Sequence, residues 1–152
     1  MYARAFYTLA RAAILCAGVM VTGCGGAGGP TSYRPVATVD QVMDAIVIPS
    51  SQAIFDAVVY DNGVLVQAPK MDDDWFALQM QAIAVAEAGN LLLMPGRAKD
   101  TGDWQTMAHA MTAAAVKVAQ AAEAKDVDRM LATGGEMYAA CVECHRKYLP
   151  ME

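Results

Sequence analysis

Two cysteines and a histidine lie within five positions near the end of the chain. In the stretch AACVECHRKYLP (139–150), Cys141 and Cys144 are three positions apart and His145 follows directly. On a helix, residues at i, i+3 and i+4 project from one side, so two thiols can reach the vinyl groups on one porphyrin edge while the imidazole binds iron. CxxCH is the attachment pattern of c-type haem. The motif predicts one covalent haem c with His145 as the proximal iron ligand.

Zinc binding and disulfide exchange fit this motif less well. A zinc site would need two further Cys, His or acidic ligands, and the other histidine of the chain, His109, stands alone. A thioredoxin-like pair is expected where a strand leads into a helix, whereas this CxxC falls on the last turns of a predicted helix. Haem attachment is therefore the favoured interpretation.

The first 23 residues predict export. Arg4 and Arg11 make the start positively charged, and the ten apolar residues Ala12–Val21 are too few to span a bilayer but typical of a signal-peptide core. The stretch VTGC that ends at Cys24 resembles the lipobox of bacterial lipoproteins, in which Cys24 would be lipidated and become the first mature residue. A soluble periplasmic protein cut nearby is the alternative.

Residues 24–37 predict a flexible tether, because Cys24 is followed by GGAGG (25–29) and Pro30. Acyl chains on Cys24 would hold the protein on a membrane surface. Gly25 at the second mature position, rather than Asp, favours the outer membrane of a Gram-negative cell.

Charge and cysteine content narrow the classes further. Without residues 1–23 the chain has 9 basic and 16 acidic side chains, a formal net charge of −7, which argues against nucleic acid as a partner. Cys16 leaves with the signal peptide, so Cys141 and Cys144 are the thiols left for the folded part. Two cysteines are too few for the disulfide framework of a small secreted domain.

Residues 38–152 predict an all-α domain, an antiparallel four-helix bundle with the haem near its C-terminus. Apolar residues recur there at helical spacing between Gly, Pro and Asp signals. The expected elements are a first helix from Thr38, capped with Gln41 and interrupted or kinked at Pro49 before continuing over 50–60, a turn at 61–63, an extended connection over 64–69, a second helix from the aspartates 72–74 to the stop at 94–96, a third from Thr101 or Asp103 to about 124, and a fourth from Asp126 to about Tyr148.

Each predicted helix has an apolar side that we expect to face the core. These inward residues are Val39, Val42, Met43 and Ile46, then Phe76, Met80, Ile83, Ala84 and Leu91, then Trp104, Met107, Met111 and Val118, and finally Met130, Leu131, Met137 and Cys141. Gly134 and Gly135 interrupt the fourth helix at a cost of roughly 1 kcal/mol each relative to Ala. They indicate either a helix break or space for something large and flat beside the helix.

A chain with four predicted helices and CxxCH near its end resembles the class II cytochromes c, the group that includes cytochrome c-prime and its low-spin relatives. It is also similar to a lipoprotein branch of proteobacterial c-type cytochromes with a Pro-interrupted first helix, a stretch like EAGNLLLMPGR (87–97) and a terminal CVECHRKY. The resemblance implies thioethers at Cys141 and Cys144 and proximal ligation by His145. It also implies a basic residue near the haem propionates, for which Arg146 and Lys147 are candidates. The alternative is that these two side chains simply lie in solvent at the helix end, where positive charge suits the helix dipole.

The resemblance implies that the first helix covers the distal haem face, where Met43 is the candidate sixth ligand. Ligation by its thioether would give a six-coordinate, low-spin electron carrier. If Met43 only packs over the ring, iron would be five-coordinate and open to NO or CO. A different ligand, His109 or Met94, is the remaining alternative, and Pro49 makes the geometry of the first helix differ from the family pattern.

Four aromatic residues are candidate haem neighbours, with simple core packing as the alternative for each: Trp75, Trp104, Tyr138 and Tyr148.

The chain has no paired-carboxylate, nucleophile-base or phosphate-cradling pattern, so we expect no enzyme activity. The sequence predicts a membrane-tethered, periplasm-facing mono-haem cytochrome that passes single electrons between redox partner proteins. The alternative is a five-coordinate protein that binds NO or CO, and the resemblance also allows a homodimer.

Overall fold

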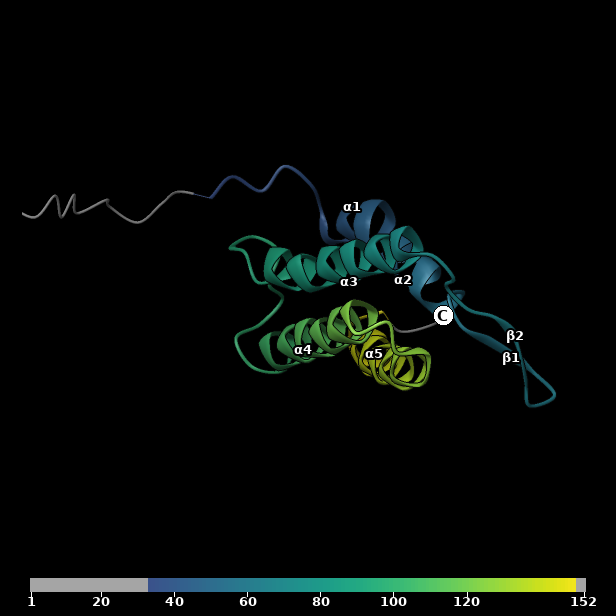
Figure 1. Ribbon diagram of the computed structural model, residues 1–152. Coiled ribbons are helices and arrows are strands. Elements are labelled where there is room, and N and C mark those ends of the chain that lie inside the picture. Colours follow the sequence, from purple (N-terminus) through teal and green to yellow (C-terminus); the bar gives the residue numbers. More distant parts are fainter. Residues whose placement is uncertain (1–32, 150–152) are drawn as a thin grey trace, which may run out of the picture. The chain divides into compact units, whose positions relative to one another are not determined.

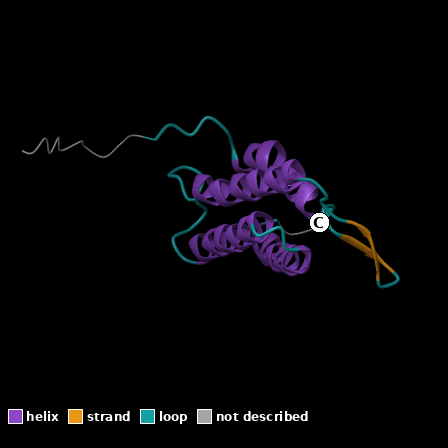
Figure 2. Ribbon diagram, in the orientation of Figure 1, coloured by secondary structure: helices purple, strands orange, loops and turns teal. Residues whose placement is uncertain are grey.

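The computed structural model describes residues 33–149; the predicted signal peptide, Cys24 and most of the tether lie outside the described residues, as do residues 150–152. The described part is mostly helical with one small two-stranded sheet (Figures 1 and 2). None of its helices is long and apolar enough to cross a membrane. In chain order the elements are α1 (Val39–Val42), the π-helical segment η1 (Met43–Val47), α2 (Ile48–Phe55), β1 (Val59–Asp61), β2 (Val64–Gln67), α3 (Asp72–Leu92), α4 (Asp103–Glu123) and α5 (Val127–Tyr148).

The first helical segment begins with the predicted capping box. Gln41 N donates to Thr38 Oγ1 at 3.2 Å, and Thr38 N donates to Gln41 Oε1 at 3.0 Å, so two backbone donors are satisfied. Pro49 does not break the helix; the chain passes from α1 through η1 into α2 without a non-helical residue. A proline clashes with the carbonyl four residues before it, and in η1 the hydrogen bonds span five residues instead, as from Ile48 N to Met43 O.

The prediction of an all-helical fold missed a β-hairpin. The helix expected over 50–60 ends at Phe55, and β1 then pairs antiparallel with β2. Asn62 and Gly63 form the turn with φ of +47° and +79°, the positive values that a tight type I′ hairpin turn requires. Val59 and Tyr60 favour strands over helices, and this preference prevails once the helix has ended.

The core forms where α3 packs along α4, α4 packs along α5, and α2 packs against α3. By contrast, α2 and α5 touch only briefly. The most deeply buried side chains are small or flexible: Ala82, Val85 and Ala88 on α3, Ala115, Val118 and Ala121 on α4, and Met130 and Met137 on α5.

The predicted inner side of α3 was wrong for three of its five residues, whereas Ala84 is half-buried and Leu91 packs against the core. Phe76, Met80 and Ile83 are 61%, 38% and 42% exposed. Between Ala82 and Gly89 the buried residues of α3 are instead small, mostly alanine, whereas larger buried side chains stand nearer the two ends, at Trp75, Leu78 and Leu92. Gly89 lies at a close approach to α4: a Cβ there would lie 2.0 Å from Thr112 Oγ1 and 3.1 Å from Ala108 O.

Replacing Gly89 by alanine is expected to lower the free energy of unfolding by about 1–3 kcal/mol, because overpacking forces neighbouring groups apart. Urea titration followed by circular dichroism measures this change. The matched control is Gly135→Ala, where a Cβ would meet nothing within 4 Å; it is expected to raise stability by up to about 1 kcal/mol through helix propensity. Equal effects of the two substitutions would contradict the close approach of α3 to α4.

Candidate functional site

The cysteines and histidine of the C-terminal motif line a small apolar cavity together with the first helical segment. The cavity lies where η1, the end of α3, the start of α4 and the end of α5 meet. Its wall includes Met43 and Val47 from η1, Leu92 from α3, Trp104, Met107 and Met111 from α4, and Ala140, Cys141, Cys144 and His145 from α5. The fold thus brings Met43 to residues about a hundred positions later in the chain.

Cys141 and Cys144 are free thiols, and both are partly buried. Burial raises the pKa of Cys141, and the neighbouring Cys144 raises it further; burial also raises the pKa of Cys144. Both thiols are therefore protonated near neutral pH. Within residues 33–149, no three His, Cys, Asp or Glu side chains are arranged to hold a metal ion on their own.

The chemistry of the cavity wall fits a haem of the c type. Two thiols, an imidazole and the thioethers of Met43, Met107 and Met111 line an otherwise apolar space, and thiols, imidazole and thioether are the groups that such a haem uses for attachment and axial ligation. The cavity volume is about 30 Å³, which leaves room for about two water molecules at most. A porphyrin therefore requires the wall to open. The π-helical segment η1 contributes Met43 and Val47 to this wall, and π-bulges are frequent at functional sites.

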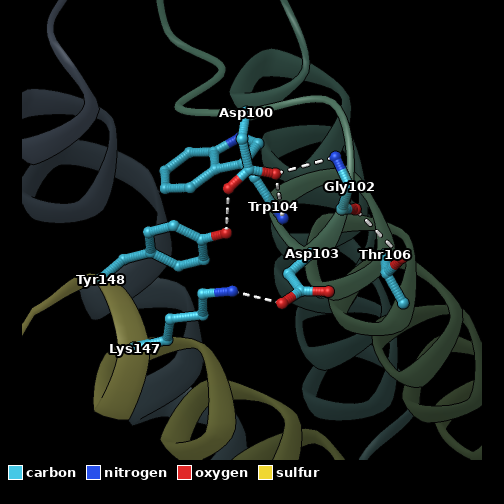
Figure 3. A network of polar contacts seen from close by, with 7 residues as sticks. All are labelled: Asp100, Gly102, Asp103, Trp104, Thr106, Lys147 and Tyr148. Atoms are coloured by element: carbon cyan, nitrogen blue, oxygen red, sulfur yellow. Dashed lines mark hydrogen bonds and ion pairs between the residues drawn. The ribbon is translucent and has the colours of Figure 1, made fainter.

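The wall is held together by a polar network between α4 and α5, shown in Figure 3. Asp100 Oδ1 accepts hydrogen bonds from the backbone N–H groups of Gly102 at 2.8 Å and Trp104 at 3.0 Å, and Asp100 Oδ2 accepts one from the Tyr148 hydroxyl. The Trp104 and Tyr148 rings pack edge to face with centroids 4.9 Å apart. Trp104 Nε1 donates to Leu92 O at 2.9 Å. The network therefore fixes the end of α5 against the start of α4 and the end of α3.

The basic residues after the motif are both engaged on the protein surface. Arg146 Nη1 lies 2.7 Å from Glu143 Oε1, and Lys147 pairs with Asp103 at the start of α4. These pairs are exposed, so each contributes little stability. The solvated helix end thus describes both residues in this structure, and a place beside haem propionates stays a prediction for Arg146 and Lys147.

The Asp100 network predicts acid sensitivity. The hydrogen bond from Tyr148, and then those from the backbone of Trp104 and Gly102, hold the pKa of Asp100 below its ordinary value of 3.8. The folded state therefore binds this proton less readily than the unfolded state. The resulting stability is present above about pH 4 and is lost as pH falls through the folded-state pKa.

Asp100→Asn is accordingly expected to destabilise the protein at neutral pH, with the difference from the parent chain shrinking as pH falls below about 4. Urea titrations at several pH values measure it. Asp73→Asn, at an exposed carboxylate on the first turn of α3, is the control. A destabilisation by Asp100→Asn that is independent of pH would argue against this network.

Of the other predicted candidates, some lie away from the cavity wall. Trp75 is buried in the core, Tyr138 lines a separate groove, and His109 is exposed on α4. Met94 contacts Arg97, with Sδ 3.2 Å from Nη1. Neither His109 nor Met94 lines the cavity, whereas Met43 does, together with Met107 and Met111 of α4.

Arg97 was missed by the sequence analysis. Its side chain is only 6% exposed and pairs with no carboxylate among the described residues. Instead Nε donates to Ala37 O at 2.9 Å and Nη1 donates to Leu91 O at 3.1 Å. Arg97 thus ties the segment before α1 to the last carbonyls of α3, where a cation is favoured. The MPGR sequence directly after the helix was the available signal.

Comparisons with protein-family models, with curated proteins and with solved structures find no match for this chain. The resemblance to class II cytochromes c consequently depends on the CxxCH motif and the order of the helices. Function has to be argued from the cavity and its wall.

Proposed function

We propose that the protein is a membrane-tethered, periplasm-facing mono-haem c-type cytochrome, a four-helix bundle that carries single electrons between redox partner proteins. The observation that carries this proposal is the shared apolar cavity of Met43, Cys141, Cys144 and His145. Sequence segments at the two ends of the folded part meet there, and they supply both attachment groups and both axial ligands. The protein acts as a carrier rather than as an enzyme.

Each group on the wall has a role in this proposal. Cys141 and Cys144 hold haem c through thioethers, His145 is the proximal ligand and Met43 is the distal ligand. When bound, the haem supplies one-electron redox chemistry, at the raised potential that Met and His ligation favours. Trp104 and the methionines of α4 exclude water, and the Asp100–Tyr148 contact holds the end of α5 in position.

A five-coordinate protein that binds NO or CO is the second candidate. It is favoured by the apolar character of the cavity wall, to which Met43, Val47, Met107 and Met111 all contribute. If the Met43 thioether packs without ligating, this wall leaves an iron site that admits small uncharged molecules and repels charged ones.

Two measurements test the proposal on the purified full chain. Haem staining after denaturing electrophoresis detects covalent attachment, and its absence would leave a lipoprotein without haem. The visible spectrum of the reduced protein then separates the candidates. A low-spin spectrum that is indifferent to CO supports the electron carrier, whereas a high-spin spectrum that shifts with CO supports the gas-binding protein.

Cys24→Ser tests the tether. Without the acylated thiol, the protein is expected to move almost entirely from the membrane pellet to the soluble periplasmic fraction, because lipid chains provide the membrane affinity in this proposal. Immunoblots of the two fractions measure the distribution. Cys16→Ser, within the predicted signal peptide, is the control and should leave the protein in the pellet. Retention of the Cys24→Ser protein in membranes would refute lipid anchoring at this residue.

A further inference from the structure

The β-hairpin carries an apolar surface that the described chain does not cover. All seven residues of β1 and β2 are exposed, and five of them are large and apolar: Val59, Tyr60, Val64, Leu65 and Val66. Figure 2 shows the hairpin projecting away from the helices. A lone two-stranded hairpin is only marginally stable in water, and a contiguous exposed apolar surface marks an interaction site. We call residues 59–67 the arm.

A groove of about 340 Å³ lies at the base of the arm. Ile54 and Phe55 of α2 and Val58 form one side, and residues of α5 including Leu131 and Tyr138 form the other. The groove exists because α2 and α5 touch only briefly, and it shares no lining residue with the cavity described above. We call it the α2–α5 groove.

Gly134 and Gly135 also line the groove, on a helix that continues unbroken through them, so the helix-break interpretation was wrong. Packing within the chain does not require either glycine. A Cβ at 134 would meet only Ile54 Cγ2, at 4.0 Å, and one at 135 would meet nothing within 4 Å. Gly89, by contrast, has Thr112 directly against it. The groove therefore keeps open a space that costs helix stability and that the described chain leaves unfilled.

We propose that the arm of one copy of this chain lies in the α2–α5 groove of a second copy, and that the exchange is reciprocal in a two-fold dimer. Each copy carries both an apolar arm and an apolar groove, and the two adjoin along the chain, since Val58 lines the groove and Val59 begins the arm. A two-fold interface requires such a self-complementary surface. Tyr60 pairs with Leu65 across the hairpin, so these two side chains share one face, while Val64 and Val66 share the other. Either face can enter an apolar groove.

Other occupants explain less of the structure. A small apolar ligand would fill the groove but leave the arm exposed. A membrane surface fits poorly, because Asp61 and Asn62 lie at the tip of the arm and residues 55–69 contain no Lys or Arg to attract anionic lipids. A second copy covers both surfaces, and it does so without depending on the haem proposal.

Sedimentation velocity of the purified chain over a wide range of concentrations tests the proposal. The parent chain is expected to form a dimer. Gly135→Leu fills the groove, and the double substitution Leu65→Asp with Val66→Asp places charge on both faces of the arm; each is expected to weaken dimerisation at least tenfold. Val116→Asp, at an exposed valine on α4 outside both surfaces, is the control. Circular dichroism verifies that every variant is folded.

Mixing the groove-filled and arm-charged variants gives the decisive measurement. Neither variant retains an arm-in-groove contact with itself, but the mixture restores one, between the intact arm of the first and the open groove of the second. Heterodimers in the mixture, with monomers in each separate sample, support the exchange. A monomeric parent chain, a Gly135→Leu chain that dimerises normally, or a mixture that stays monomeric would overturn it.

Discussion

A chain in which Cys141 and Cys144 are both replaced by serine is expected to contain no covalently bound haem, whereas the parent chain is expected to stain for haem on a denaturing gel. Serine keeps the size and the helix position of each side chain, but its hydroxyl forms no thioether with a porphyrin vinyl group. The expected effect is complete, from about one haem per chain to background. Absorbance of the denatured protein measures the haem that remains.

Two further variants separate attachment from ligation. His145→Ala leaves both thiols in place, so it should retain covalent haem while losing the parent spectrum. His109→Ala removes an exposed histidine outside the cavity and should change neither property. A double-serine chain that stains as strongly as the parent would refute attachment at these cysteines.

Met43→Ala is expected to convert the reduced protein from a low-spin to a high-spin spectrum and to make it bind CO. Alanine cannot reach the iron, so removal of the thioether opens the sixth position. It also removes the contribution of methionine to the potential, which should fall. Essentially the whole low-spin population should convert, and optical titration with CO together with potentiometry measures both changes.

The same cavity offers matched controls, because Met107 and Met111 also line it. Met107→Ala and Met111→Ala remove a similar apolar volume from the α4 side of the cavity and leave every residue of η1 unchanged. Both variants should keep the low-spin spectrum. An unchanged spectrum in Met43→Ala would remove Met43 as a ligand. Conversion by Met107→Ala alone would transfer the role to Met107.

Local chemistry allowed most helix boundaries to be predicted. Thr38 with Gln41 begins the first helix, and Asp126 caps α5 by accepting from Arg129 N at 3.0 Å. Gly96, with φ of +88°, follows the end of α3. These helix caps and stops depend on residues within about one helical turn of each other. Both partners of each interaction can therefore be recognised in a short stretch of sequence.

The errors arose where distant segments decide the outcome. Hydrophobicity placed Phe76 and Ile83 inside, but the buried residues of α3 between Ala82 and Gly89 are small. The CxxCH motif could be recognised because its members lie within five residues. Arg97 bonds to a carbonyl sixty positions earlier, at Ala37, and Asp100 bonds to Tyr148. Such contacts exist only after the helices have packed.

The π-helical segment has a consequence for how the site can change in evolution or by design. A π-bulge amounts to one residue added to an α-helix, and each α-helical residue turns the chain by about 100°. Deleting a single residue between Met43 and Val47 would rotate Met43 around the helix axis relative to α2. The direction in which this side chain points is thus encoded in the number of residues in the segment as well as in their identities.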